Sequence, residues 1–429
     1  MSAMRRVIIA LVVVASGGVA LWRHVGSPSP AHVVIITLDT TRADRLSPYG
    51  FADLTMPALE RVAREGVVFD RAMSVAPLTL PAHTSLFTGF FPPHHGVRDN
   101  AAPALAARYT TLAETLSSHG YCTGAFVSSV VLDADRGLQQ GFERYLGVPP
   151  GENGKRSPQR RADEVIDDAI RWLDEDRACP VFLWAHLYDA HRPYEPPEPY
   201  RSRHADPYLG EIAFAEAQVD RLLGALERRR LLDNTLLIVV ADHGESLGEH
   251  GEENHGIFLY ESVLRIPLVI RLPRRTRGEM TTGTRVSDPV RLVDVMPTVL
   301  DALGVRTSAT DGVSLLEAMN GQHLDLEAYA ESTYPIRFGQ APRRALLDGR
   351  FKLIDGPNPE LYDLQRDPFE KRNVYGERRK VADAMRRRLD AIASEEAGPN
   401  AGVSPVEVPP DLRSRLEALG YIGHAHRLP

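Results

Sequence analysis

The sequence predicts an α/β fold with a mixed, mostly parallel sheet flanked by helices, and three observations support this fold class. Continuous apolar runs of strand length occur at 32–39, 180–189, 234–245 and 266–273. Their lack of polar alternation is typical of strands buried on both faces. Segments with helical spacing of apolar residues lie between or after these runs, as expected of βαβ units.

The predicted helices, in chain order, cover 111–119, 162–176, 211–229 and 291–303. The third shows the helical period most clearly, with one apolar face made by Ile212, Ala215, Val219, Leu222, Leu223 and Leu226. Each of these segments is long enough to cover part of a sheet, so together they predict the layers that flank it.

The composition changes beyond about residue 325. "RRALLDGRFKLIDG" predicts two short strands around an Asp-Gly turn, and "PELYDL" predicts a third. A helix at 380–396, a linker-like stretch and a terminal helix at 411–423 follow. The sequence thus predicts four parts. They are an N-terminal segment with a linker (1–30), a large α/β domain (31–320), a small C-terminal antiparallel-sheet subdomain (321–396), and a linker with a terminal helix (397–429).

The N-terminal segment predicts export. Arg5 and Arg6 precede an uncharged apolar stretch from Val7 to Trp22. This stretch is long for a signal peptide and short for a membrane span of about 20 residues. Because no clear cleavage site precedes Arg23, an uncleaved membrane anchor is favoured over a cleaved signal. Either interpretation places the body of the protein outside the cytoplasm, in the periplasm or anchored to the membrane.

Charge and cysteine content exclude some classes of protein. The formal net charge is -7, and the basic runs are too short to form a patch, so no nucleic-acid partner is expected. Cys122 and Cys179 are isolated and match neither a zinc motif nor a disulfide framework. A single disulfide between them stays open, depending on the redox compartment. The oligomeric state is not predicted by the sequence.

Polar side chains follow three of the predicted strands. Asp39 ends the first; His186, Asp189 and His191 lie at or just after the end of the second; Asp242 and His243 end the third. Sites in open α/β sheets form beyond the carboxyl ends of the strands. Although one such Asp is often only a helix cap, three sets in register predict a site for a divalent cation, which is Ca²⁺, Mg²⁺, Mn²⁺ or Zn²⁺.

The segment "TLPAHTSLFTG", which begins at Thr79, predicts the start of a helix with Pro81 in its first turn. Thr79 is then either a helix cap or a nucleophile activated by a cation. In the second interpretation, the free N–H groups at the start of the helix are expected to hold an incoming anion. The sequence alone leaves both open.

These motifs give the chain a family resemblance. The stretches "VVIITLDTTRADRLSPYG", "TLPAHTSLFTGFFPPHHGV", "HLYDAHRPYEPP", "ADHGESLGEHG" and "ELYDLQRDPFEKRNV" resemble the sulfatase branch of the alkaline phosphatase superfamily in order and spacing, over roughly residues 32 to 375. The resemblance implies an alkaline-phosphatase-like fold and a metal-dependent ester hydrolase. By position, it implies metal ligands at Asp39, Thr40, Thr79, Asp242 and His243. It also implies substrate contacts at Asn100 and a substrate or leaving-group contact at His191.

The chain departs from the family's motifs in several positions. Thr79 occupies the slot of the Cys or Ser that becomes formylglycine, and threonine cannot form that aldehyde. His83 occupies the Arg slot, Val127 to Val130 replace a Gly-Lys-x-His stretch, and His255 replaces a late Lys. We therefore expect His83, Asn100, His186, Asp189 and His255 to bind substrate, while the histidines and Asp189 also leave room for a second ion.

The expected function is an exported, metal-dependent hydrolase of sulfate or phosphate esters that uses Thr79 as nucleophile and His191 in catalysis. The substrate is a small-molecule, glycan or lipid ester. A phosphoryl-group transferase that acts on lipid or cell-envelope acceptors is the alternative, because threonine nucleophiles and membrane anchors also suit such enzymes. The sequence does not decide between sulfate and phosphate.

Overall fold

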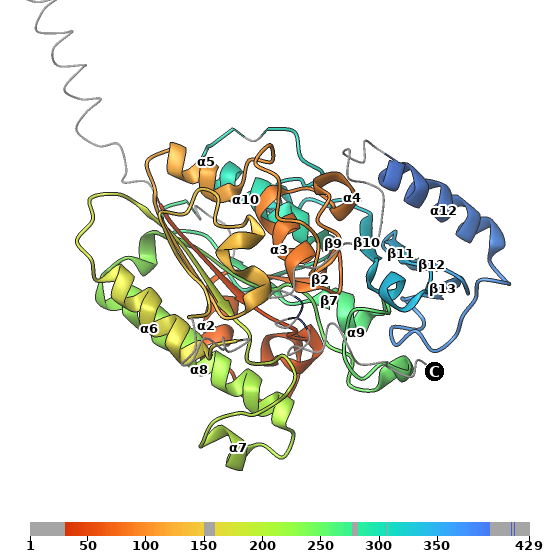
Figure 1. The fold of residues 1–429 in the computed structure, drawn as a ribbon, viewed down its shortest axis with the longest axis horizontal. Helices are drawn as coiled ribbons and strands as arrows, with labels where there is room; N and C mark the ends of the chain where they lie inside the picture. The colour runs from red at the N-terminus through yellow and green to blue at the C-terminus, as the bar shows by residue number, and fades with distance from the viewer. Residues whose placement is uncertain are drawn as a thin grey trace, which may run out of the picture. The chain divides into compact units, whose positions relative to one another are not determined.

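The computed structural model describes residues 31–149, 159–276, 282–306 and 308–394, together with Arg413 and Leu416. Its centre is a nine-stranded mixed sheet (Figure 1). The strands are β1 (His32–Leu38), β2 (Val67–Met73), β3 (Cys122–Val127), β4 (Arg144–Leu146), β5 (Val181–Leu187), β6 (Thr235–Ala241), β7 (Arg265–Ile266), β8 (Leu268–Arg271) and β9 (Thr284–Arg291).

The strand order is β4-β3-β5-β1-β6-β8-β2-β7, with β9 also paired to β2. The five strands from β4 to β6 are parallel. Of these, β1, β5 and β6 confirm the strands predicted at 32–39, 180–189 and 234–245, whereas β3 and β4 were not predicted. In contrast, β8 runs antiparallel to both β6 and β2. The apolar run at 266–273 therefore forms the antiparallel part of the sheet, a direction that hydrophobicity alone does not reveal.

Helices cover both faces of the sheet (Figure 1). One face is covered by α2 (Pro57–Glu65), α6 (Ala162–Leu173) and α8 (Pro207–Arg228), and the other by α3 (Thr79–Thr88), α5 (Leu112–Ser118) and α10 (Val295–Ala302). The shorter helices are α4 (Pro92–His95), α7 (Tyr200–Arg203), α9 (Glu261–Leu264) and α11 (Leu316–Met319). Because both faces are covered, successive residues of β1 from Val33 to Ile36 are all fully buried.

A second, four-stranded antiparallel sheet follows, as predicted. It consists of β10 (Ala328–Ser332), β11 (Arg343–Leu347), β12 (Phe351–Asp355) and β13 (Glu360–Asp363), and α12 (Arg379–Ser394) packs against it (Figure 1). Leu353, Leu361 and Leu389 belong to the same hydrophobic core as residues of the large sheet. From His32 onward the described residues form one unit, so this sheet is a subdomain and not a separate body.

Two sequence predictions concern the ends of the chain. The export segment from Val7 to Trp22 lies outside the described residues, and none of the described helices has the length and hydrophobicity needed to cross a membrane. In the predicted terminal helix, Leu416 is described and fully buried in the large core. The rest of that helix lies outside the described residues, apart from Arg413.

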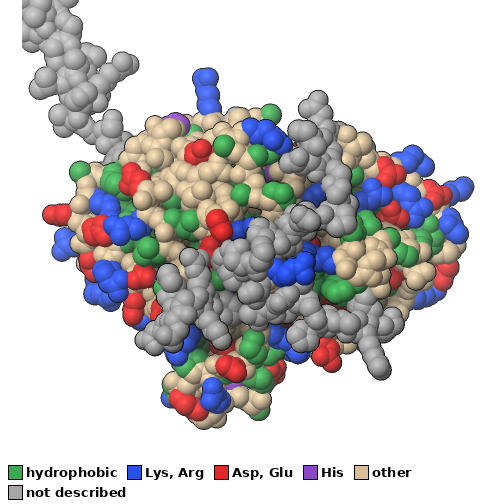
Figure 2. Space-filling view, viewed as in Figure 1, with side chains coloured by type: hydrophobic (Ala, Val, Ile, Leu, Met, Phe, Trp, Pro, Cys, Tyr) green, Lys and Arg blue, Asp and Glu red, His purple; other side chains and the backbone are tan. Residues whose placement is uncertain are grey.

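Cys122, at the start of β3, and Cys179, just before β5, form a disulfide with a Cα–Cα distance of 5.8 Å. The pairing that the sequence left open is therefore made. On the face shown in Figure 2, acidic and basic side chains are mixed and form no large patch of one sign.

Candidate active site

The carboxyl ends of the neighbouring strands β1 and β6 carry the centre of the site. Leu38 is paired with Ala241, so the next residues, Asp39 and Asp242, leave the sheet side by side. Together with His243 they form the one group of three or more His, Cys or acidic side chains, among the described residues, whose ligand atoms all lie within 4.8 Å of one another. The predicted convergence of strand ends is confirmed.

Asp242 is held by the backbone through one oxygen only. Its Oδ1 accepts hydrogen bonds from the N–H groups of Thr40 (3.2 Å) and His243 (2.8 Å). Its Oδ2 is buried and has no hydrogen-bond partner among the described residues. A buried carboxylate oxygen without a donor is costly unless a cation faces it. Oδ2 is therefore suited to bind a metal ion.

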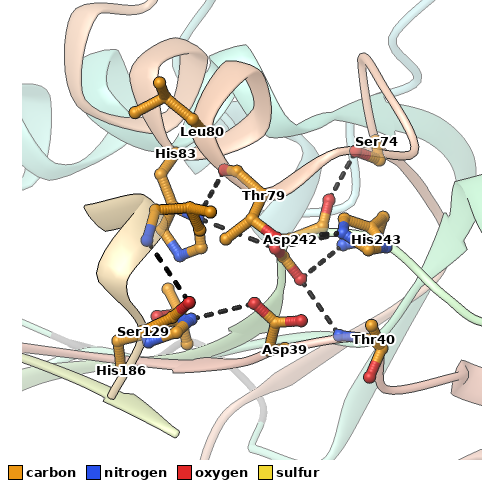
Figure 3. Close-up of polar contacts among 12 residues, drawn as sticks. Asp39, Thr40, Ser74, Thr79, Leu80, His83, Ser129, His186, Asp242 and His243 are labelled. Atoms are coloured by element: carbon orange, nitrogen blue, oxygen red, sulfur yellow. Dashed lines mark hydrogen bonds and ion pairs between the residues drawn. The ribbon is translucent and has the colours of Figure 1, made fainter. Parts of the chain in front are cut away.

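Asp39 shows the same division of its two oxygens. His186 Nε2 lies 3.0 Å from Asp39 Oδ2, whereas Asp39 Oδ1 is buried without a hydrogen-bond partner in the described chain (Figure 3). Burial raises the pKa of Asp39 to about 7, and nearby His243 offsets part of this effect. Burial and then the Asp39 charge raise the pKa of Asp242. Two buried carboxyls that face each other in this way favour a bound cation.

His243 presents a nitrogen to the same space. Its Nδ1 donates to the carbonyl oxygen of Gly244 (2.9 Å), so the lone pair of the neutral ring is on Nε2. Nε2 lies 3.4 Å from Asp242 Oδ2 and 3.5 Å from Thr79 Oγ1. Burial lowers the pKa of His243, but the carboxylates of Asp242 and Asp39 outweigh it and raise the pKa. A bound cation would replace that proton.

Thr79 is the first residue of α3, and its hydroxyl points toward the two aspartates and His243 (Figure 3). The N-cap residue of α3 is Leu78, and no side chain caps the helix there. The helix-cap interpretation of Thr79 is therefore wrong. The hydroxyl is fully buried, and its Oγ1 lies 3.5 Å from His243 Nε2.

The first turn of α3 differs from the expected ring of free N–H groups. The N–H of Leu80 donates to Asn100 Oδ1 (2.9 Å), Pro81 has no N–H, and the N–H of Ala82 donates to the carbonyl of Leu78 (3.1 Å). Asn100 Nδ2 is buried and has no hydrogen-bond partner among the described residues. Asn100 thus stabilises the helix start with its oxygen, which leaves its amide nitrogen as a donor for a bound anion.

His83 lies one helical turn after Thr79. Its Nδ1 donates to the Thr79 carbonyl (2.8 Å) and lies 3.7 Å from Asp242 Oδ2. Burial lowers the pKa of His83 to about 3. The ring is fully buried behind the cluster, so it is a neutral support and does not replace the positive charge of the family's arginine.

Thr40 was predicted to be a metal ligand. Its N–H holds Asp242, and its own hydroxyl is buried without a hydrogen-bond partner in the described chain. The residue has a φ of 49°, which is unfavourable for a β-branched side chain. Strain of this kind, about 1–3 kcal/mol, is found where the surroundings fix a residue in place, often at functional sites.

A second set of rings lies beside the metal ligands. The ring of His255 lies 4.5 Å from that of His243 and 5.0 Å from that of His191, measured between centroids. His255 Nδ1 donates to Glu245 Oε1 (2.9 Å), and the Tyr194 hydroxyl donates to Glu245 Oε2 (3.1 Å). The structure thus brings His191 and His255 to the site, as expected.

Glu245 was not predicted as a functional residue. The sequence predicts that Glu245, Glu249, Glu252 and Glu253 lie in a solvated loop. In the structure, however, Glu245 is fully buried and Glu252 is 7% exposed. Burial raises the pKa of Glu245 to about 8, against the opposing effect of His243. The solvated-loop interpretation is wrong for these two residues. The only signal in the sequence for the contact between Glu245 and His255 is that the histidine follows ten residues after the glutamate.

Asp189 does not join the metal cluster. Its Oδ1 accepts a hydrogen bond from the N–H of Ala162 (3.1 Å), at the start of α6. It lines a separate cavity of about 300 Å³ with Glu211 and Pro193. Its other oxygen, Oδ2, is buried without a hydrogen-bond partner among the described residues, so the expected contact of Asp189 with substrate stays a prediction. Within the described ranges, no second group of three His, Cys or acidic side chains lies close enough together to hold the second ion that the sequence left open.

Comparison with known proteins identifies the family. Residues 31–305 match the sulfatase family, and residues 248–395 match the C-terminal family of N-sulphoglucosamine sulphohydrolase. The chain belongs to the sulfatase family. It is thus an ester-hydrolysing enzyme.

Relatives of this sulfatase-family chain cover most of its length. A choline-sulfatase from Rhizobium meliloti is 27% identical, with 80% of this chain and 82% of the relative covered. A steryl-sulfatase from Mus musculus is 25% identical, with 84% and 81% covered. Among solved structures, the phosphonate monoester hydrolase of Agrobacterium radiobacter is 23% identical to this chain in sequence, and the match covers 85% of this chain and 96% of that protein. The two structures superpose with a TM-score of 0.73, which confirms the fold.

Proposed function

We propose that this enzyme is an exported, metal-dependent hydrolase that uses Thr79 as its nucleophile. One observation carries the proposal: the Thr79 hydroxyl does not cap its helix and instead points at the free ligand atoms of Asp39, Asp242 and His243. A hydroxyl is a poor nucleophile until a base or a cation activates it.

The residues fit a divalent cation. Asp39 Oδ1, Asp242 Oδ2, His243 Nε2 and Thr79 Oγ1 would hold it, which is a mixed set of oxygens and one nitrogen. An imidazole ligand favours Mn²⁺ or Zn²⁺ over Ca²⁺ and Mg²⁺. When bound, such an ion lowers the pKa of a coordinated hydroxyl and stabilises negative charge that develops on oxygen.

The reaction then follows two substitutions at the same atom. In the first, Thr79 Oγ bonds to the phosphorus or sulfur of the ester, the bond to the alcohol oxygen breaks, and the alcohol leaves with a proton. In the second, water attacks the threonyl ester, which regenerates the Thr79 hydroxyl and releases the acid. We propose that Asn100 Nδ2 holds an oxygen of the transferred group and that His191 and His255 transfer the protons of the leaving alcohol and the water. The buried Asn100 Nδ2, which has no hydrogen-bond partner among the described residues, and the ring contacts of the two histidines beside His243 support these roles.

Threonine favours phosphorus over sulfur as the atom attacked. A formylglycine hydrate can expel sulfate by collapsing to the aldehyde, but a threonyl ester has no such route. The second step must therefore be a direct attack by water, a route available to a phosphoryl-threonine. We accordingly propose phosphate or phosphonate esters as the preferred substrates.

Export is supported by the disulfide between Cys122 and Cys179. Disulfides persist in oxidising compartments such as the periplasm and are rare in the cytosol. The apolar segment from Val7 to Trp22 supplies the signal or membrane anchor that this proposal needs.

A substrate panel tests the proposal. The purified metal-free enzyme is reconstituted with Mn²⁺, Zn²⁺, Ca²⁺ or Mg²⁺ and assayed on an aryl sulfate, a phosphate monoester, a phosphate diester and a phosphonate monoester. Turnover of a phosphorus ester with Mn²⁺ or Zn²⁺, and loss of turnover on chelation, is the expected result. Turnover that survives chelation, or that is confined to the aryl sulfate, would contradict it.

A further inference from the structure

His186 was expected to bind substrate, but the structure places it behind a metal ligand. The residue is fully buried near the end of β5, where its neighbour in register on β1 is Thr37. Its Nε2 lies 3.0 Å from Asp39 Oδ2 (Figure 3). The side of Asp39 that His186 contacts is thus the side turned away from the unpartnered oxygen Oδ1.

The tautomer of His186 is fixed from the other side of its ring. The backbone N–H of Ser128 donates to His186 Nδ1 (3.3 Å), so Nδ1 is the acceptor and Nε2 carries the proton. The Ser128 hydroxyl also donates to the His186 carbonyl (2.7 Å). Both contacts are fully buried, so water does not compete with them.

Ser128 follows directly after β3, in the stretch where the chain departs from the family's motif. A lysine there could reach substrate; a serine is too short and instead holds His186. A chain of contacts therefore runs from the end of β3 through the imidazole to the carboxylate at the end of β1. The position of the Asp39 carboxylate is well fixed because Ser128, His186 and Asp39 all lie at or near strand ends of the same rigid sheet.

We infer that His186 is a positioning residue, held by Ser128, that donates to Asp39 Oδ2 so that Oδ1 faces the cation. The inference rests on the metal site of the proposed function. Groups that orient a metal ligand in this way typically change metal affinity by about 10- to 100-fold when they are removed. His186 acts through Asp39 and does not touch the reacting atoms.

The test compares two amide substitutions in the full-length enzyme. A glutamine places its amide nitrogen near the position of Nε2, whereas the shorter asparagine places it near Nδ1. We expect His186→Asn to weaken Mn²⁺ binding by about 10- to 100-fold, and His186→Gln to bind Mn²⁺ within about threefold of the wild type. Titration of the metal-free protein by calorimetry measures both dissociation constants, and thermal unfolding confirms that each variant is folded.

His95→Asn is the matched control. His95 is also a buried histidine, but it bonds to Ser85 (2.9 Å) and the backbone of Val97 instead of a metal ligand. This variant should lose stability without changing Mn²⁺ affinity. If His186→Asn does not fold, His186→Met against His186→Gln decides: methionine keeps a long side chain but has no N–H to donate to Asp39 Oδ2, so weaker Mn²⁺ binding is expected only in His186→Met.

The outcomes separate this inference from the proposed function. Equal Mn²⁺ affinity in the wild type, His186→Asn and His186→Gln overturns the positioning role and leaves the metal site intact. Equal affinity in His186→Met and His186→Gln does the same when the asparagine variant is unfolded. A wild type that binds no Mn²⁺ or Zn²⁺ overturns both.

Discussion

Substitution of Thr79 separates its two interpretations by magnitude. A capping threonine contributes about 1 kcal/mol, which its replacement by valine or alanine would remove. The structure gives α3 no side-chain cap, so Thr79→Val, which keeps the shape of the side chain, should cost less than about 1 kcal/mol of unfolding free energy. Thr79→Ala also removes a buried methyl group and should cost about 1 kcal/mol more.

The loss of catalytic activity in these variants should be much larger than the loss of stability. If Thr79 is the nucleophile, both variants should bind the metal ion and lose at least about 10³-fold in kcat/KM, which corresponds to about 4 kcal/mol of transition-state stabilisation. Thr79→Ser keeps a hydroxyl and should retain measurable turnover. Thr84→Val is the matched control, because Thr84 lies on the same helix and donates only to the backbone carbonyl of Leu80 (2.7 Å). It should keep nearly full activity.

The assays are denaturant unfolding, metal analysis, and steady-state kinetics on the best substrate of the panel. Mass spectrometry of the wild type, quenched during turnover of a slow phosphorus ester, should find the phosphoryl group on the peptide that contains Thr79. A Thr79→Val enzyme that turns over this substrate within about tenfold of the wild type would refute the reasoning.

Three further predictions follow from the same structure. Asp242→Ala removes both the backbone-bonded and the free oxygen of a metal ligand, so stoichiometric Mn²⁺ or Zn²⁺ and activity should both disappear; full metal content by elemental analysis would contradict the assignment. Burial raises the pKa of Glu216 from 4.5 to about 7, so the folded protein binds more protons than the unfolded chain between these values and loses stability as the pH rises through that window. Glu216→Gln should therefore gain up to about 3 kcal/mol relative to the wild type in urea unfolding at pH 8 and little at pH 5, while an equal difference at both pH values would count against it. Tagged full-length protein should fractionate with the membrane or periplasm because of the segment from Val7 to Trp22, and a mainly cytoplasmic pool would rule out export.

Three of the five parallel strands, β1, β5 and β6, were predictable from sequence because they are continuous apolar runs, whereas the short strands β3 and β4 were not predicted. β2 and β9 were missed for the opposite reason. "VVFDRAM" carries charges in its middle, and "TRVSDPVR" contains a proline, yet the two strands pair with each other across the sheet. Their partners lie far away in the chain, so tertiary packing and not local pattern makes them strands.

The convergence of Asp39 and Asp242 was predictable because each follows directly after a strand, where the backbone itself sets the direction of the side chain. Glu245 lies only two residues beyond His243, but its burial depends on Tyr194 and Arg42, which come from distant segments. No local pattern distinguishes it from the half-buried Glu249 and the exposed Glu253 in the same loop. The same holds for His186, whose role is set by the register of β5 against β1.

The replaced motif residues change how this site can bind an anion. Where the family's motifs carry arginine and lysine, this chain has His83, Ser128 and His255. Burial lowers the pKa of His83 to about 3 and that of His255 well below its ordinary value. Fixed positive charge is thus exchanged for two neutral imidazoles and a hydroxyl. His83, together with His186 from β5, contacts the carboxylates of Asp242 and Asp39. In the proposed mechanism a bound cation would then supply most of the charge that holds the ester, so we expect substrate binding, and not only turnover, to depend on the metal ion.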